Sequence, residues 1–264
     1  MQLFISNCHL QTALPKQQDF SMHTHDTYEL FCFLGGDADY SVEGNRYALQ
    51  HGDVMLMRKG EAHHLILKSS APYERMIINF DIPNIAELDP DNRLLAPFND
   101  RPLGKFNQYK TSLFPGNQWQ YYINKLCECT THHQKLCYLM PLLNELAECF
   151  ETVRTTYPTA EKDRAAAVIK YINRNLCSEL SLSALADHFY LSKTHLNRIF
   201  KQSTGSTVWD YIIVKRLFLA REMIHAGEPP TKVCLYCGFK DYTTFYRAYK
   251  QHFGTSPRRD YQTQ

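Results

Sequence analysis

The chain has 264 residues, of which 29 are Lys or Arg and 27 are Asp or Glu, so its formal net charge is +2. No segment approaches the ~18 consecutive apolar residues of a membrane span, and the first ten residues lack the basic and apolar stretches of a secretion signal. We therefore expect a cytoplasmic protein with no membrane partner. The nine cysteines are expected to be reduced thiols, because disulfide frameworks are typical of small secreted domains.

The charges are divided unequally along the sequence. Residues 1–163 carry 14 Lys+Arg and 20 Asp+Glu, a formal charge of −6, whereas residues 164–264 carry 15 and 7, a formal charge of +8. Lys and Arg neutralise phosphates and supply the sequence-independent part of DNA affinity. Because the length suits two domains, the basic C-terminal part is predicted to bind a polyanion and the acidic part to serve another task.

Residues 20–80 contain short apolar or alternating runs, separated by turn residues such as Gly35-Gly36-Asp37 and Glu43-Gly44-Asn45. This density of hairpin signals predicts a small β-barrel or sandwich, with strands expected at 30–34, 38–42, 46–49, 54–57 and 64–67. Apolar residues at helical spacing over 118–126 and 136–150 predict helices packed against the barrel or against a second subunit. The proline-rich residues 82–115 support no firm assignment.

Two copies of one helical pattern lie about fifty residues apart in the C-terminal part. Each has a short amphipathic helix, a turn and a second helix, at about 181–205 and 230–254. Ser181, Ser192 and Asp241 are predicted N-caps, and Gly254 ends the last helix. The helical pattern between the copies, over 207–224, would span roughly 27 Å at ~1.5 Å per residue. Two recognition helices could therefore lie about one DNA turn, ~34 Å, apart.

The second helix of each copy carries polar side chains opposite its apolar stripe. They are Thr194, Asn197, Arg198 and Lys201 in the first copy, and Tyr242, Thr243, Thr244, Arg247 and Lys250 in the second. Asn suits adenine and Arg suits guanine, because each makes two hydrogen bonds to a base edge in the major groove. A solvated helix face is the alternative explanation, but the repetition favours contact with double-stranded DNA.

Further positions of both copies follow one known pattern. They are Leu185-Ala186, Ser192, Leu196, Arg198, Phe200-Lys201, Gly205 and Tyr211 in the first copy, and Gly238-Phe239, Phe245, Arg247, Tyr249-Lys250, Phe253-Gly254 and Ser256-Pro257 in the second. Residues 164–260 thereby resemble the AraC/XylS family of transcriptional regulators. The resemblance implies that the N-terminal barrel holds a small organic effector such as a sugar or related metabolite, and that an activator of this kind has RNA polymerase as a partner. It also implies that seven of the polar residues above face DNA, namely Thr194, Asn197, Arg198, Tyr242, Thr243, Thr244 and Arg247.

The N-terminal part contains a second recognisable spacing, formed by His23-Thr24-His25, Glu29, Gly36, Gly52-Asp53, Gly60 and His63. It resembles the paired motifs of the cupin barrel, except that Arg58 stands where a proline is usual and Leu67 where an asparagine often lies. His23, His25, Glu29 and His63 could complete a divalent metal site, because two His flanking one residue point the same way. Without metal, these residues with Tyr28, Phe33 and Tyr40 would line a small-ligand pocket.

The sequence thus predicts an α+β multidomain protein. We expect a cupin-like β-barrel with appended helices at 1–152, a linker at 153–163, and an all-α domain at 164–264 with two helix-turn-helix motifs joined by a long helix. The predicted function is that of a sequence-specific DNA-binding transcriptional regulator without enzymatic activity, whose barrel senses a small-molecule effector. The helices near 118–150 are predicted to form a homodimer.

Two alternatives remain open. A cupin enzyme, such as a metal-dependent isomerase or dioxygenase with a DNA-binding tail, would need a metal ion in the barrel. A metal or redox sensor would act through Cys129, His133 and Cys137, which fall at i, i+4 and i+8 on one predicted helix face. A straight row of ligands needs a fourth group from elsewhere to surround an ion.

Overall fold

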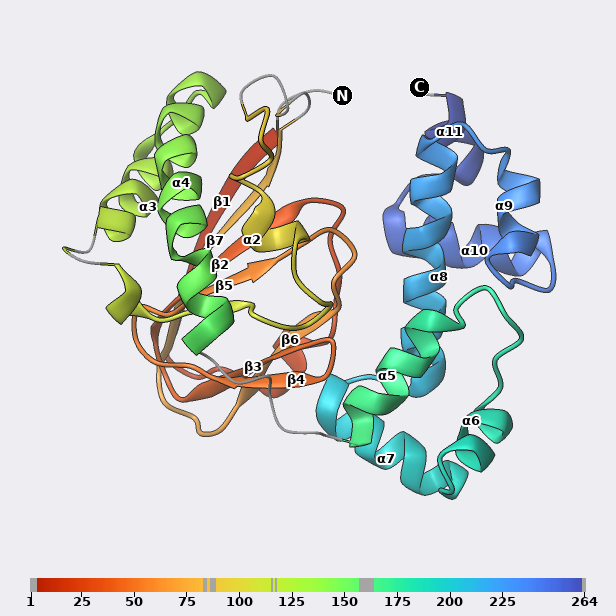
Figure 1. Ribbon diagram of the computed structural model, residues 1–264. Helices are drawn as coiled ribbons and strands as arrows, with labels where there is room; N and C mark the ends of the chain where they lie inside the picture. The colour runs from red at the N-terminus through yellow and green to blue at the C-terminus, as the bar shows by residue number, and fades with distance from the viewer. Residues whose placement is uncertain are drawn as a thin grey trace. The chain divides into compact units, whose positions relative to one another are not determined.

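The computed structural model describes residues 4–82, 85, 89–114, 116, 118–156 and 164–262. The chain separates into two compact units, 1–161 and 162–264, which are described one at a time (Figure 1). The first combines strands and helices, and the described part of the second is helical, as the predicted α+β class requires. No helix in the described ranges is long and apolar enough to cross a membrane.

Two antiparallel sheets form the N-terminal unit. The larger has the strand order β1-β7-β2-β5-β8 and the smaller β4-β3-β6. The strand bounds are β1 (Phe4–Thr12), β2 (Tyr28–Gly35), β3 (Ala38–Val42), β4 (Asn45–Ala48), β5 (Val54–Met57), β6 (His63–Leu67), β7 (Tyr73–Asp81) and β8 (Gln108–Tyr109). The predicted turn between β3 and β4 needs its glycine, because Gly44 has φ +75°, in the left-handed region.

Alternation along β2 distributes its side chains between two cores. Phe31 and Phe33 pack with Tyr40 and Met55 in the core between the two sheets. Leu30 and Cys32 point to the other face of the large sheet, where they join the core formed with the helices. The strand is therefore buried on both faces, which explains its continuous apolar run.

Two helices cover the outer face of the larger sheet, α3 (Gln118–Glu128) and α4 (His132–Thr156) (Figure 1). Trp119 and Ile123 on α3, and Leu139, Leu142 and Leu146 on α4, are buried at helical spacing. Helix α4 extends four residues beyond the segment assigned to the first domain. The remainder of the predicted linker, 157–163, lies outside the described residues.

The predicted row of Cys129, His133 and Cys137 on one helix face is wrong. Helix α3 ends at Glu128 and α4 begins at His132, so Cys129 lies in the connection between them. The Thr131 hydroxyl accepts a hydrogen bond from the Gln134 amide at 3.3 Å, and this cap starts a new helix. The three candidate ligands therefore do not form a continuous helical row.

The segment that resisted assignment contains the short helix α2 (Ala96–Asn99), strand β8, the short 3-10 helix η2 (Thr111–Leu113) and a buried ion pair. A further 3-10 turn, η1 (Gln17–Phe20), precedes β2. Arg101 donates to both carboxylate oxygens of Glu61 at 2.8 and 2.7 Å, and Asn107 donates to the same carboxylate at 3.1 Å. These bonds hold residues 101–107 against the turn between β5 and β6.

Seven helices form the described part of the C-terminal unit. They are α5 (Arg164–Arg174), α6 (Leu182–His188), α7 (Lys193–Thr204), α8 (Val208–His225), α9 (Pro230–Tyr236), α10 (Tyr242–Phe253) and α11 (Pro257–Gln262). The predicted caps are confirmed, because the side chains of Ser181, Ser192 and Asp241 accept amide hydrogen bonds from the first turns of α6, α7 and α10. Gly254 ends α10 with φ +70°.

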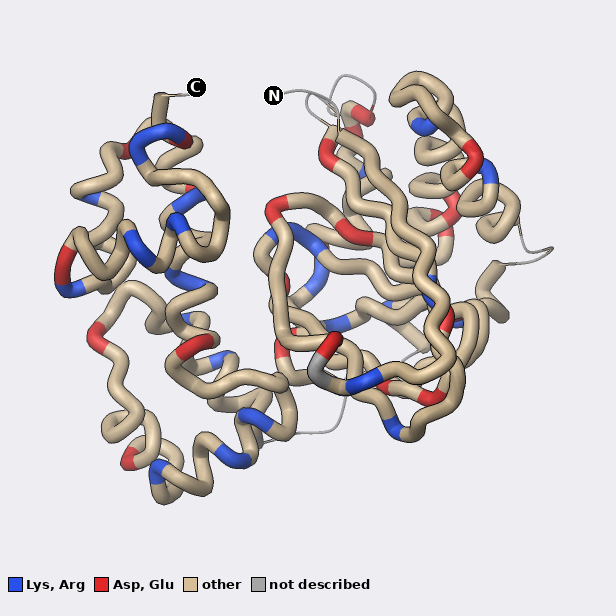
Figure 2. Tube along the Cα trace, turned by 180° about the vertical axis from the view of Figure 1, so that it is seen from behind, with Lys and Arg blue, Asp and Glu red and all other residues tan. Residues whose placement is uncertain are grey.

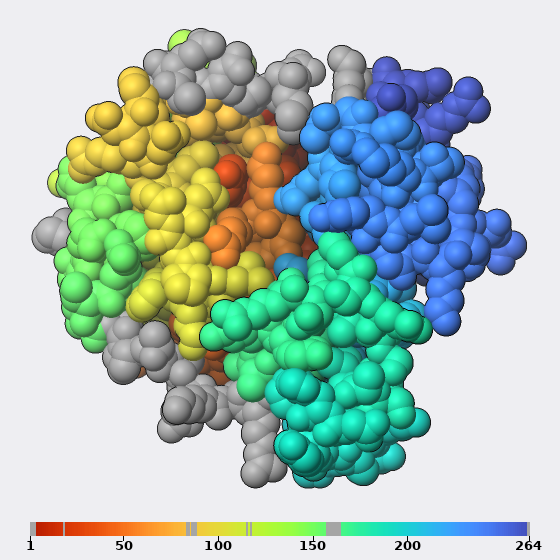
Figure 3. Space-filling view, turned by 45° about the vertical axis from the view of Figure 1, so that its right-hand side comes forward, coloured from red at the N-terminus to blue at the C-terminus, as the bar shows by residue number. Residues whose placement is uncertain are grey.

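The predicted spacer helix is α8, with 18 residues and Thr207 as its N-cap. The pairs α6–α7 and α9–α10 lie toward opposite ends of α8 (Figure 1). Figure 3 shows the two halves as adjoining lobes, green to cyan for α5–α7 and blue for α8–α11. The repeat in the sequence is therefore a repeat of structural units on one connecting helix.

Candidate DNA-binding face and ligand pocket

Helix α7 buries one side and exposes the other. Leu196 and Phe200 are fully buried, whereas Thr194, Arg198 and Lys201 are exposed on the remaining turns. The helix begins at a serine cap and ends at a glycine with left-handed backbone, so these exposed side chains project from a short helix with defined ends. Two of the three are cations, which suits the phosphates and guanine edges of a DNA groove.

Asn197 differs from the other predicted DNA-facing residues of α7. It is half-buried, and its side-chain oxygen accepts a hydrogen bond from the amide of Val208, the first residue of α8, at 3.3 Å. Pairing with adenine needs both the oxygen and the amino group of an asparagine. The structure thus gives Asn197 a role at the start of α8, which sequence spacing did not suggest.

Helix α10 repeats the arrangement of α7. Phe245 and Tyr249 are buried, whereas Thr243, Arg247 and Lys250 are exposed. Two other predicted DNA-facing residues lie on the first turn. Tyr242 is 37% exposed, and the Thr244 hydroxyl donates to the capping carboxylate of Asp241 at 2.8 Å.

Tyr246 on α10 was missed by the sequence interpretation. It is 36% exposed and lies three residues after Thr243 and one before Arg247, on the outward side of the helix. Its ring centroid is 6.4 Å from that of Tyr242. The sequence could have indicated Tyr246, because a residue four positions after Tyr242 lies on the same face of a helix.

Arg216 on α8 connects the two helix-turn-helix halves. Its guanidinium donates to the carbonyl oxygens of Leu176 and Ser178, after α5, at 3.0 and 2.8 Å, and to that of Gly238, after α9, at 2.7 Å. Gly238 has φ +80°, and a Cβ there would lie 2.7 Å from the Arg216 Cζ atom. The glycine therefore allows the close approach that fixes the two halves to one another.

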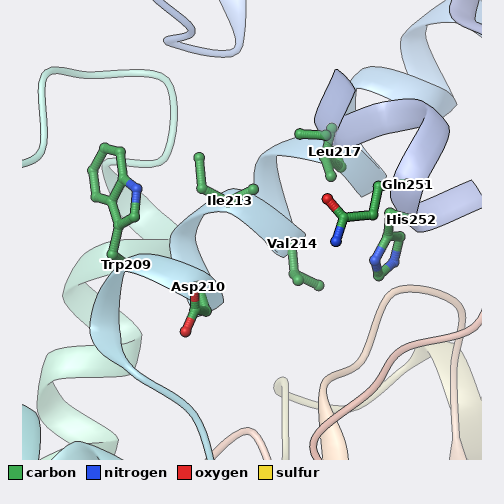
Figure 4. Close-up of a pocket in the computed structure, with 8 residues that line it drawn as sticks. Trp209, Asp210, Ile213, Val214, Leu217, Gln251 and His252 are labelled. Atoms are coloured by element: carbon green, nitrogen blue, oxygen red, sulfur yellow. The ribbon is translucent and has the colours of Figure 1, made fainter. Parts of the chain in front are cut away.

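Lys and Arg recur along the helices of the C-terminal unit, and Asp and Glu are fewer (Figure 2). The surface also has a groove lined by α8 and α10, with Trp209, Ile213, Val214 and Leu217 along one side and Gln251 with His252 on the other (Figure 4). Its lining is largely apolar and contains none of the predicted DNA-facing residues. The groove is therefore distinct from the basic faces of α7 and α10.

Four of the residues predicted to bind a metal or effector converge at one end of the inter-sheet core. The candidate ligand atoms of His23, His25 and His63 all lie within 4.8 Å of one another. The Glu29 carboxylate is 2.9 Å from the His25 Nε2 atom and 3.6 Å from the His63 Nε2 atom. The spacing in the sequence thus predicted a cluster that the fold assembles from β2, β6 and the segment before β2.

Backbone contacts orient two of these imidazoles. The Nδ1 atoms of His23 and His63 lie 2.8 and 2.7 Å from the carbonyl oxygens of Ser21 and Glu61. A carbonyl oxygen only accepts, so Nδ1 carries the proton and Nε2 presents its lone pair to the cluster. Burial lowers the pKa of His63 to about 3 and also lowers the pKa of His23, so both rings are neutral at physiological pH.

The Glu29 carboxylate is fully buried and charged. Burial by itself would raise its pKa, but the close contact with His25 and the electrostatic interactions with the other two histidines lower it to about 2. The Tyr40 hydroxyl donates to one carboxylate oxygen at 3.4 Å, and the ring of Tyr40 stacks on that of His63. Phe33 lies in the same inter-sheet core.

Tyr28 does not belong to this group, so its predicted place in the pocket is wrong. It precedes Glu29 on β2, so its side chain points to the opposite face of the sheet. There its ring packs on Phe80 and Phe98, in the core shared with the helices. Because Tyr28 and Glu29 are consecutive on one strand, only one of them can face the pocket. The sequence alone already excluded placing both there.

Two pocket residues were missed by the sequence interpretation, Tyr73 and Arg75 on β7. Arg75 pairs with Phe33 of β2 in the sheet register, which places both on the inter-sheet face. The Tyr73 hydroxyl, the Arg75 Nη1 atom and the His63 Nε2 atom are buried without a hydrogen-bond partner. Buried polar groups are nearly always paired in folded proteins, so this concentration marks a surface that is suited to a polar ligand.

The fold and these two sites define a class of protein: two helix-turn-helix units on a common helix, joined in one chain to a β-sandwich with a cluster of buried polar side chains at one end of its core. Comparisons with known proteins agree with that class. Residues 10–102 match the family model described as an AraC-like ligand binding domain, and residues 185–262 match the model of a helix-turn-helix domain.

Curated relatives align over nearly the whole chain. The HTH-type transcriptional activator RhaS of Escherichia coli O81 is 25% identical over 94% of this chain and 90% of its own length. RhaS of Escherichia fergusonii is 26% identical with the same coverage. Among solved structures, ToxT from Vibrio cholerae aligns with 97% of this chain and 96% of its own at 12% identity, with a TM-score of 0.40.

The chain therefore carries the two domains of AraC-type transcriptional regulators, an AraC-like ligand binding domain followed by a helix-turn-helix domain. Its biochemical function is therefore sequence-specific DNA binding in response to a small molecule. The relatives that it matches are transcriptional regulators, in agreement with the predicted function.

Proposed function

We propose that this protein activates transcription by binding an operator with α7 and α10 while its sandwich interior binds a small polar effector. The observation that carries the effector half is the set of unpaired buried polar atoms on His63, Tyr73 and Arg75, close to the buried Glu29 carboxylate. A sugar or related metabolite is the effector class we propose, because its hydroxyl groups both donate and accept hydrogen bonds. The similarity to proteins named transcriptional activators supports the sign of regulation.

For the operator, the exposed residues of α7 and α10 are the proposed contacts. Thr194, Arg198 and Lys201 would enter one major groove, with Tyr242, Thr243, Thr244, Arg247 and Lys250 in the next. Arg198 and Arg247 are the proposed base-reading residues, because an arginine makes two hydrogen bonds to guanine. Asn197 is left out of the base-reading set, since its oxygen already serves α8.

The operator proposal can be tested with a DNA site selected from a random library. Arg198→Ala and Arg247→Ala should each weaken binding to that site by about 1–3 kcal/mol in fluorescence anisotropy, with little change on random DNA. Lys232→Ala is the matched control, because Lys232 is an exposed cation on α9 that pairs with Glu228. Equal losses on selected and random DNA would show that the two arginines contact phosphate alone.

The effector proposal can be tested by thermal unfolding of the full chain in the presence of a panel of sugars and sugar acids. A ligand that binds the folded state raises the midpoint in proportion to the logarithm of its concentration. Arg75→Met should abolish that shift, because it removes a buried donor from the inter-sheet face. A shift that is unchanged in Arg75→Met would place the ligand elsewhere.

We also propose that the protein is a cytoplasmic homodimer that recruits RNA polymerase, with α3 and α4 as the dimer surface. Tyr121 on α3 is 54% exposed, and its ring lies edge-on to Tyr138 of α4 at 6.3 Å. Tyr138 is partly buried, so the exposed member of the pair is Tyr121, and exposed aromatic side chains are enriched at subunit contacts. Tyr121→Glu should convert the dimer to a monomer in sedimentation experiments, and transcription in vitro from a promoter that carries the selected site tests activation.

A further inference from the structure

We propose that His23, His25, Glu29 and His63 together bind one divalent first-row transition metal ion inside the N-terminal sandwich. The site would join the segment before β2 to strands β2 and β6, since each of these elements supplies at least one ligand. This inference does not depend on DNA binding. It would add a metal centre to the interior that we propose as the effector pocket.

The distances between the candidate ligand atoms fit a single ion. In a tetrahedral site, ligands that bind one zinc ion at ~2.0–2.1 Å lie about 3.3–3.4 Å from one another. The His25 Nε2 atom is 2.9 Å and the His63 Nε2 atom 3.6 Å from a Glu29 oxygen, and the three histidine atoms lie within 4.8 Å. Small rotations of the side chains would therefore bring all four to the required distance.

The surroundings of the ligands are those of metal-binding residues. Histidine ligands usually donate their second ring N–H to a carbonyl or carboxylate, which fixes the ring and directs the other nitrogen at the ion. His23 and His63 do so toward the carbonyl oxygens of Ser21 and Glu61. The Tyr40 hydroxyl holds one oxygen of the Glu29 carboxylate in the same way.

A simple ion pair does not account for the cluster. One carboxylate can pair with one imidazole, yet three imidazole rings are gathered with centroids 4.5–5.1 Å apart. The His63 Nε2 atom is buried without a hydrogen-bond partner, and the His63 and Glu29 residues are each 1% exposed. A cation at the centre would satisfy all of these lone pairs at once.

The ligand types indicate which ions would bind. Imidazole nitrogens favour zinc, copper, iron and nickel, whereas calcium and magnesium prefer sites made of oxygen atoms alone. Three neutral histidines and one carboxylate leave a net charge of +1 on a divalent ion. Four protein ligands also leave room for a further oxygen ligand if the coordination number rises to five or six.

The experiment is a metal titration of the full chain after removal of metal with a chelator. Equilibrium dialysis against Zn²⁺ or Co²⁺, followed by elemental analysis, should give one ion per chain. His63→Gln and Glu29→Gln should each weaken binding by about 100-fold or more, because loss of a group that only orients a ligand already costs about 10–100-fold. The ion should raise the thermal midpoint of the wild type by roughly 5–10 °C at a hundred times its Kd.

His64→Gln is the matched control. His64 is the next residue on β6 and is also buried, but its ring is not part of the ligand group, since neighbouring side chains on a strand point to opposite faces. It should retain one ion per chain. His25→Gln provides a second ligand variant at a partly exposed position in case His63→Gln does not fold, as judged by circular dichroism without metal.

Cobalt also distinguishes this site from binding by cysteine. Ligation by imidazole and carboxylate gives visible d–d absorption without the near-ultraviolet charge-transfer band that thiolate ligands produce. The proposal is overturned if the wild type binds no stoichiometric ion, if the histidine variants and His64→Gln bind equally, or if alkylation of the thiols removes the metal.

Discussion

Replacing Arg216 by Met would test how the two helix-turn-helix halves are held together. The substitution keeps the aliphatic length but removes three hydrogen bonds to the carbonyl oxygens of Leu176, Ser178 and Gly238. Each buried carbonyl left without a donor costs about 1–3 kcal/mol. Part of this cost is offset, because the buried guanidinium is itself desolvated, and this burial lowers the pKa of Arg216. We expect the free energy of unfolding of the C-terminal unit to fall by about 3–5 kcal/mol.

The two tryptophans allow this unit to be followed in the full chain, since Trp119 lies on α3 and Trp209 on α8. In a Trp119→Phe background, urea unfolding monitored by fluorescence reports Trp209 alone. Lys232→Met serves as the control, because the Lys232 side chain is 70% exposed and its surface ion pair should contribute less than about 1 kcal/mol. The interpretation fails if the free energy of unfolding of the Arg216→Met variant lies within about 1 kcal/mol of that of its Trp119→Phe parent.

Two further predictions concern individual polar groups. Asn197→Ala should lower the free energy of unfolding of the C-terminal unit by about 1 kcal/mol, because the Asn197 oxygen accepts a hydrogen bond from the first amide of α8. The base preference of the selected operator should be unchanged, and a changed preference at one position in a repeated selection would contradict this. The N-terminal unit should lose stability as the pH falls from 7 to 5 in the presence of chelator. Burial lowers the pKa of His63 to about 3 and of His64 to about 4, so below about pH 6.5 the unfolded chain binds protons that the folded chain does not. The slope should approach about 1.4 kcal/mol per pH unit for each such histidine. His64→Gln should remove about one such contribution in urea unfolding followed through Trp119, and a pH-independent midpoint would refute the assignment.

Local signals in the sequence predicted the C-terminal unit closely. The caps at Ser181, Ser192 and Asp241 and the glycine after α10 act within one helical turn, so their effect does not depend on distant residues. The observed helix α8 spans Val208–His225, one residue from the predicted range. Arg216 was not identified, because its three partners lie 40, 38 and 22 residues away in sequence.

Strand prediction succeeded where turns separate short apolar runs and failed at the edge of the larger sheet. Strand β1 exposes much of its surface, and Ile5 is its one buried position, so no apolar alternation marks it. Strand β7 does alternate, with Met76, Ile78 and Phe80 buried on one face, and this pattern could have identified it. The pairing of β7 between β1 and β2 is a long-range property that local patterns do not determine.

The same limit explains the differences at the candidate pocket. The histidines and Glu29 were found because they lie in motifs with a recognisable spacing, whereas Tyr73 and Arg75 join them through the register of β2 against β7. Tyr28 was included because it is aromatic and close in sequence to Glu29. Strand alternation outweighs closeness along the chain, because a one-residue step reverses the face.

The charge of the C-terminal unit overstates the number of cations that can contact phosphate. Arg216 is 3% exposed and bonded to carbonyl groups, and Arg221 pairs with the buried Asp260, so both stabilise the fold. Lys201 and Lys250 lie instead on the outward faces of α7 and α10. Each phosphate contact contributes about −0.9 to the slope of log affinity against log salt concentration. Lys201→Met and Lys250→Met should therefore each make the slope shallower by about 0.9 on any DNA sequence. The control Lys232→Met should leave the slope unchanged. Equal slopes for all three variants would show that the two lysines do not contact DNA.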